Sequence, residues 1–112
     1  IAGLNRLRRE NPALLQTNDL RFALIDDPNV IGFVKQSADG GNAIAAAIAL
    51  AAGVHEFWFH FGDLTIGPAE ARGAVRAIEN LSTGERHVLQ WGGVRLRIDT
   101  AADPLVLLRC YR

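Results

Sequence analysis

The stretch Val54–Phe61, which reads Val-His-Glu-Phe-Trp-Phe-His-Phe, carries the clearest structural signal in the sequence. Aromatic residues dominate it, and such residues favour extended strands. Successive side chains of a strand point to opposite faces, so His55 lies with the three phenylalanines, Phe57, Phe59 and Phe61. Trp58 then lies on the other face, with Val54, Glu56 and His60. The phenylalanines predict a buried core on one side of this strand.

Short candidate strands separated by turn residues extend on both sides of this stretch. Clusters such as Asp26-Asp27-Pro28-Asn29 and Ser82-Thr83-Gly84 are typical of turns. About eight short strands with regular turns predict an all-β fold, an antiparallel β-sandwich of Greek-key-like type. In chain order, the other predicted strands are Leu20–Ile25, Val30–Gln36, Ala74–Asn80, Glu85–Trp91, Val94–Asp99 and Leu105–Tyr111.

The run Ala43–Ala52 allows two interpretations. Alanine is the best helix former and a poor strand residue, so propensity alone predicts a helix here. A fully buried central strand is also a continuous apolar run, and predicted strands flank this one on both sides. We therefore predict a strand, with a helix as the alternative. A second segment without a clear strand pattern, Gly67–Gly73, is expected to be a loop.

The first residues of the chain have a different pattern. Ile1, Leu4 and Leu7 recur at helical spacing with arginines between them, and Asn11-Pro12 ends the pattern. A helix this short is marginal in water by itself. We therefore expect residues 1–12 to be the end of the last helix of an upstream domain, and residues 13–112 to form the sandwich. Exposed in isolation, the apolar stripe would also support a homodimer.

Composition excludes several classes of protein. The 112 residues fit one domain, and 12 basic residues balance 12 acidic ones, so no net charge attracts nucleic acid or an anionic membrane. The longest apolar run, 43–52, is too short to span a bilayer. Cys110 is the single cysteine, which rules out an intramolecular disulfide and suits a reducing compartment. With no secretory signal at the start, we expect a cytoplasmic protein.

A family likeness rests on several motifs in chain order. Ile1–Leu14 (Ile-Ala-Gly-Leu-Asn-Arg-Leu-Arg-Arg-Glu-Asn-Pro-Ala-Leu) resembles the last barrel helix of the bacterial α-1,4-glucan:maltose-1-phosphate maltosyltransferases, members of the α-amylase superfamily. Further motifs resemble that family's C-terminal sandwich: Asn18–Phe22, Val30–Lys35, Leu81–Arg86, Gln90–Gly93 and Val94–Asp99. Ile48–Ala52 stands where the family has a polar turn, which indicates a divergent relative.

The resemblance implies a non-catalytic role for this chain. In that family a (β/α)8 barrel carries the carboxylate nucleophile and the acid/base, and both would lie upstream of Ile1. The resemblance therefore places no catalytic residue and no cofactor on this chain. It implies an accessory domain that packs against the barrel of the same polypeptide and stabilises it.

Two tryptophans are the candidate binding residues. Trp58, opposite the phenylalanines, has three interpretations: it packs on the barrel, it lies under a loop, or it binds α-glucan. Trp91, beside Gly92-Gly93, is expected to plug the hairpin, with glucan binding as the alternative. The predicted domain-interface residues are Ile1, Leu4, Leu7 and Trp58.

Metal and thiol chemistry are not expected. His55 and His60 would face opposite sides of their strand, so they could not share a metal ion with Glu56. Cys110 alternates with Val106 and Leu108, which predicts a small core residue rather than a reactive thiol.

Overall fold

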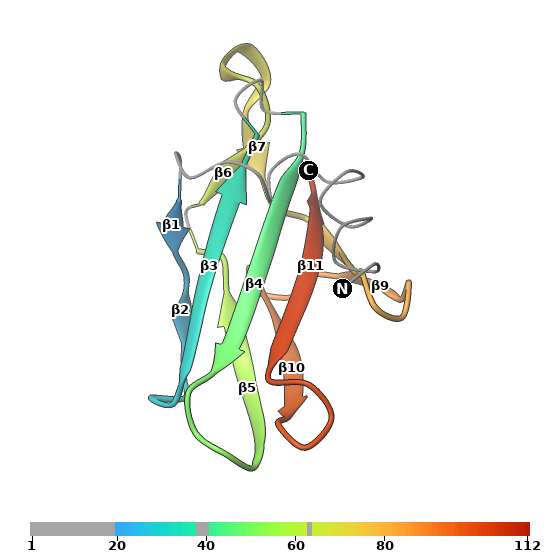
Figure 1. Ribbon diagram of the computed structural model, residues 1–112. Helices are drawn as coiled ribbons and strands as arrows, with labels where there is room; N and C mark the ends of the chain where they lie inside the picture. Colours follow the sequence, from blue (N-terminus) through green and yellow to red (C-terminus); the bar gives the residue numbers. More distant parts are fainter. Residues whose placement is uncertain (1–19, 38–40, 63) are drawn as a thin grey trace.

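The computed structural model describes residues 20–37, 41–62 and 64–112 (Figure 1). The predicted helix, the domain boundary at residue 12 and the interface residues Ile1, Leu4 and Leu7 lie outside the described residues. The described part holds eleven strands and one short 3₁₀ helix, η2 (Ala69–Ala71), and no helix in it is long and apolar enough to cross a membrane. The strands are β1 (Arg21–Phe22), β2 (Leu24–Ile25), β3 (Val30–Gln36), β4 (Ala43–Ala49), β5 (Val54–His60), β6 (Thr65–Ile66), β7 (Gly73–Ala74), β8 (Ala77–Asn80), β9 (Arg86–Val88), β10 (Gly93–Asp99) and β11 (Leu105–Tyr111).

The strands form two stacked sheets and a small ribbon. The larger sheet has six strands in the order β1-β3-β4-β11-β8-β9, and the smaller has three in the order β10-β5-β2. β6 and β7 pair as a separate ribbon, and the described strand pairs are antiparallel. In Figure 1 the smaller sheet lies behind β3, β4 and β11. The predicted all-β sandwich is confirmed.

The core lies between the two sheets, and the phenylalanine face of β5 fills it as predicted. Phe57, Phe59 and Phe61 are buried against Val34 and Leu108 of the six-stranded sheet. Cys110 belongs to the same cluster, so its prediction as a small core residue is confirmed.

The alanine-rich run forms a central strand, so the helix alternative is wrong. β4 pairs with β3 on one side and with β11 on the other, and Ala45 and Ala47 are buried in the core. Tertiary pairing on both edges overrides the helical propensity of alanine. Small side chains on this inner face leave room for the large rings of β5.

Several predicted strands are shorter or divided. Leu20–Ile25 is not one strand: β1 pairs with β3 and β2 pairs with β5, so the chain passes from one sheet to the other at Ala23. Ala74–Asn80 is divided into β7 and β8. Of Glu85–Trp91 only Arg86–Val88 is strand, and the loop predicted at Gly67–Gly73 contains η2.

Candidate functional site

The outer face of the three-stranded sheet carries the candidate residue Trp58. The register of β5 with β10 pairs Trp58 with Arg95 and Glu56 with Arg97. Glu56 lies 3.5 Å from the Arg95 guanidinium and 3.9 Å from that of Arg97, and all three side chains are largely exposed. Because exposed ion pairs keep most of their hydration, this face is polar and wet around a single indole ring.

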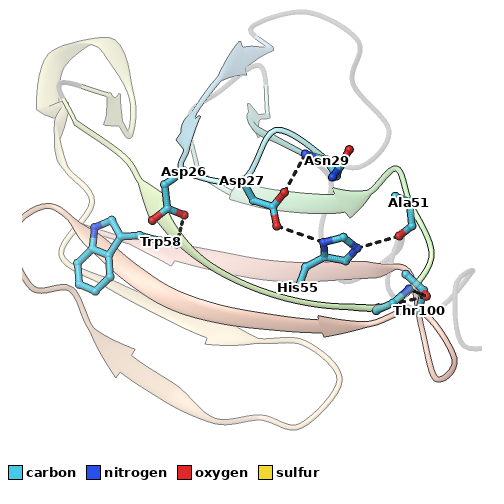
Figure 2. Close-up of polar contacts among 8 residues, drawn as sticks. Asp26, Asp27, Asn29, Ala51, His55, Trp58 and Thr100 are labelled. Carbon is cyan, nitrogen blue, oxygen red and sulfur yellow. Dashed lines mark hydrogen bonds and ion pairs between the residues drawn. The ribbon is translucent and has the colours of Figure 1, made fainter.

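Trp58 is half-buried and lies over a glycine of the neighbouring strand. A Cβ added to Gly93 would come within 2.3 Å of Trp58 Nε1, so only glycine leaves room for the indole there. The ring centroid of His60 lies 5.8 Å from that of Trp58. The Trp58 backbone N–H donates to the Asp26 carboxylate over 2.8 Å, which anchors the turn after β2 (Figure 2).

Trp91 lies in a tight turn between β9 and β10. Gln90 and Gly93 exchange two backbone hydrogen bonds of 3.0 Å each, which encloses a two-residue hairpin loop. Both loop residues have left-handed backbone, with φ of 58° at Trp91 and 74° at Gly92. The Trp91 side chain is 94% exposed, so the prediction that it plugs the hairpin is wrong.

His55 joins two loops at the far end of β5 (Figure 2). Its Nδ1 lies 3.1 Å from Asp27 Oδ2, and its Nε2 lies 2.8 Å from the Ala51 carbonyl oxygen. Both partners are acceptors, so both contacts are hydrogen bonds only when each ring nitrogen carries a proton, as in the imidazolium form. The Ala51 carbonyl and then the Asp27 carboxylate raise the pKa of His55. The Asn29 backbone N–H and then His55 lower the pKa of Asp27.

Each ring nitrogen of His55 faces an acceptor of the protein itself, the Asp27 carboxylate on one side and the Ala51 carbonyl on the other. His55 bonds the turn after β2, whereas His60 packs beside Trp58 on the outer face, so the two histidines are separated as predicted. Within residues 20–37, 41–62 and 64–112 no group of three or more metal-ligating side chains gathers. Sequence reasoning missed Asp27 as the partner, because 28 residues separate it from His55.

A hollow of about 700 Å³ lies beside the end of β11. Its described lining includes three arginines, Arg72, Arg109 and Arg112, and the Arg112 guanidinium donates to the Ala71 carbonyl. Arg109 also lies with its guanidinium 5.5 Å from the centre of the Tyr111 ring. The described lining includes no Asp or Glu side chain.

The outer face of the six-stranded sheet has the opposite character to the Trp58 face. Residues on β3, β4 and β11 that alternate with the core residues are mostly aliphatic or aromatic, and the strand register places them side by side. Ile44 and Ala46 on this face are buried, although they do not belong to the core between the sheets. The apolar face consists of Ile31, Phe33, Ile44, Ala46, Ile48, Leu105 and Leu107, with Phe22 of β1 opposite Phe33.

Comparison with known proteins supports the predicted family likeness. No protein-family model matches the chain. Three bacterial relatives are each named alpha-1,4-glucan:maltose-1-phosphate maltosyltransferase. The chain is 28% identical over 67 residues to the protein of Methylacidiphilum infernorum, 41% over 56 residues to that of Chlorobaculum tepidum, and 44% over 50 residues to that of Salinibacter ruber.

The matches cover 60%, 45% and 45% of this chain, in the same order. The matched part is only 10%, 8% and 7% of the length of these relatives. The predicted resemblance to maltosyltransferases is therefore confirmed, and it concerns a small part of each relative.

Proposed function

We propose that this chain is a non-catalytic accessory domain of an α-glucan-processing enzyme, and that it packs against the catalytic barrel of the same polypeptide. The relatives are named for α-1,4-glucan and maltose 1-phosphate, and the match spans about a tenth of their length or less. For the parent polypeptide we propose glycosyl transfer or glycoside hydrolysis on an upstream barrel, as in the α-amylase superfamily.

The apolar face of the six-stranded sheet is the observation that carries this proposal. A sheet with one face on the core and one in water normally alternates apolar and polar residues. Here β4 has no polar side chain on either face, and Ile48 lies between Ile31 and Leu105. Ile44 is already buried, whereas Ile31 is 39% exposed and Phe22 is 71% exposed. A covering partner therefore gains the burial of the exposed part of the face, at no more than roughly 1.5–3 kcal/mol for each exposed side chain.

The position of β1 favours the upstream barrel as that partner. β1 is an edge strand of the six-stranded sheet and pairs with β3, as Figure 1 shows. A chain that leaves a preceding domain therefore enters the sandwich beside the apolar face. The proposed end of the last barrel helix, residues 1–12, offers Ile1, Leu4 and Leu7 as the complementary apolar stripe.

A matched pair of lysine substitutions tests the docking face in the full-length protein. Ile31 is 39% exposed on the apolar face, and Val54 is 53% exposed at the start of β5 on the other sheet. Ile31→Lys places an unpaired charge in the proposed interface, which costs about 3–5 kcal/mol if the charge stays buried. We expect calorimetry to show a lower or divided unfolding transition for Ile31→Lys and an unchanged transition for Val54→Lys. Equal, unchanged transitions in both variants would refute docking through this face.

A further inference from the structure

Trp91 combines a disfavoured backbone conformation with an almost fully exposed side chain. Its φ of 58° lies in the left-handed region, where side chains other than those of Gly, Asn and Asp are disfavoured. Its large ring is 94% exposed, so it adds almost nothing to the core. Neither the backbone conformation nor packing favours tryptophan at this position. We therefore look for a function that requires the indole side chain.

A second tryptophan lies against the same turn. Gly93, which closes the Trp91 turn, is also the residue over which the Trp58 indole lies. Trp58 Nε1 lies over Gly93, and among the described residues it donates to no protein acceptor, so its N–H remains for water or a ligand. His60 packs beside Trp58 and lies opposite Gly93 in the register, so these two rings lie at the end of the three-stranded sheet where the Trp91 turn begins. We call Trp58, His60 and Trp91 the aromatic corner.

We propose that the aromatic corner binds α-1,4-glucan, with a glucose ring stacked on the Trp91 indole. A pyranose ring has an apolar C–H face and a rim of hydroxyl groups, so it needs both a flat apolar surface and polar partners. The Trp91 indole supplies the first, and the N–H of Trp58, which lies over the glycine that closes the same turn, would supply part of the second. The choice of α-1,4-glucan rests on the proposed function, because the sugar class comes from the relatives.

The polar surroundings favour a sugar over a protein surface as the ligand. Glu56 and Arg95 lie on the same face as Trp58, and their side chains remain exposed. They can therefore form hydrogen bonds with the hydroxyl groups of a sugar. A stable protein interface has an apolar centre that is depleted in charge. The sheet face with that character is the opposite one, which the proposed function assigns to the barrel.

Trp91→Asn in the full-length protein tests the proposal without disturbing the turn. Asn-Gly is the preferred sequence of a two-residue loop with left-handed residues, so the variant is expected to keep or raise the melting temperature. We expect its affinity for glycogen, measured by electrophoresis in glycogen-containing gels, to fall about tenfold, which corresponds to about 1.4 kcal/mol. Trp91→Phe, which restores a flat ring, should recover part of that affinity.

Leu50→Ala is the matched control, because Leu50 is an exposed apolar residue in the β4–β5 hairpin. Its glycogen affinity should equal that of the unmodified protein, since any binding by the catalytic barrel is common to all variants. Unchanged glycogen affinity in Trp91→Asn overturns the proposal. A lower melting temperature with unchanged affinity also overturns it and makes Trp91 a contact to protein. The Ile31→Lys variant tests docking to the barrel, and the Trp91→Asn variant tests glucan binding. Each proposal can therefore fail without the other.

Discussion

At the scale of single residues, His55 shows how one side chain can join parts of the chain that lie far apart in sequence. Its ring bonds Asp27, in the turn after β2, and Ala51, in the hairpin after β4. Both bonds require ring N–H donors, so the contact is complete only in the imidazolium form. The folded state therefore prefers a proton on His55 and a charge on Asp27.

This preference predicts a pH-dependent stability. The pKa of His55 is raised above its ordinary 6.5, so its contribution is fully present below pH 6.5 and is lost as pH rises through the folded-state pKa. The pKa of Asp27 is lowered from 3.8, so its contribution is present above pH 3.8 and is lost as pH falls through the folded-state value. The destabilisation caused by His55→Gln should be greatest between these limits and should shrink at alkaline pH.

NMR titration of the His55 ring carbons checks this directly, alongside denaturant unfolding of both proteins across the pH range. A His55 pKa at or below 6.5 would contradict the imidazolium assignment. So would a destabilisation by His55→Gln that does not change with pH.

Cys110 carries a second prediction at this scale. Burial raises the pKa of the Cys110 thiol to about 12, and the thiolate is the nucleophilic form. We expect the folded protein to resist iodoacetamide at pH 8 and to react only as fast as it unfolds. Mass spectrometry of timed samples, with urea-unfolded protein as the positive control, measures this rate. Rapid labelling of the native protein would show that the thiol is accessible.

At the scale of elements, the closeness of the two sheets depends on small residues. Gly32 of β3 faces the core, and a Cβ there would come within 2.4 Å of the Ile25 side chain and 2.7 Å of the Phe59 ring. Neither ring nor aliphatic chain can move away easily in a close-packed core. A glycine at this position is therefore required by packing, since its φ is not in the left-handed region.

Gly32→Ala is accordingly expected to destabilise the protein by about 1–3 kcal/mol through overpacking. Gly73→Ala is the control, because an added Cβ would lie 3.6 Å or more from its nearest neighbours, which are atoms of the Arg112 side chain. We expect the control to change stability by less than about 0.5 kcal/mol. Chemical denaturation of the two variants decides the matter, and equal stabilities would show that the sheets separate readily.

Elements with simple alternation could be predicted from sequence, and elements that depend on distant pairing could not. Val30–Gln36 and Leu105–Tyr111 match β3 and β11, since turn residues bound them clearly. Alternation could not reveal that the chain changes sheets at Ala23, because the period of side chains is the same in either sheet.

The orientation of one candidate site residue could be predicted from the sequence, and the exposure of the other could not. The outward direction of Trp58 followed from the period of β5. The exposure of Trp91 did not, because a left-handed tryptophan is contrary to the usual composition of tight turns. Its φ is visible only in the folded backbone.

At the scale of the whole molecule, the two outer faces of the sandwich differ in chemistry. The six-stranded sheet presents aliphatic and aromatic residues, whereas the three-stranded sheet presents ion pairs around the aromatic corner. An accessory domain with these faces would dock one against its catalytic domain and leave the other to solvent and substrate. The central claim is therefore that the apolar face is covered in the full-length protein.

Hydroxyl-radical footprinting of the full-length protein tests this claim most directly. Phe22, at the edge of the apolar face, is 71% exposed in the sandwich, and Trp91, in the turn between β9 and β10, is 94% exposed. If the barrel covers the apolar face, Phe22 should be modified far more slowly than in the urea-unfolded chain, while Trp91 keeps nearly its unfolded rate. Modification of Phe22 at close to its unfolded rate would contradict docking through this face.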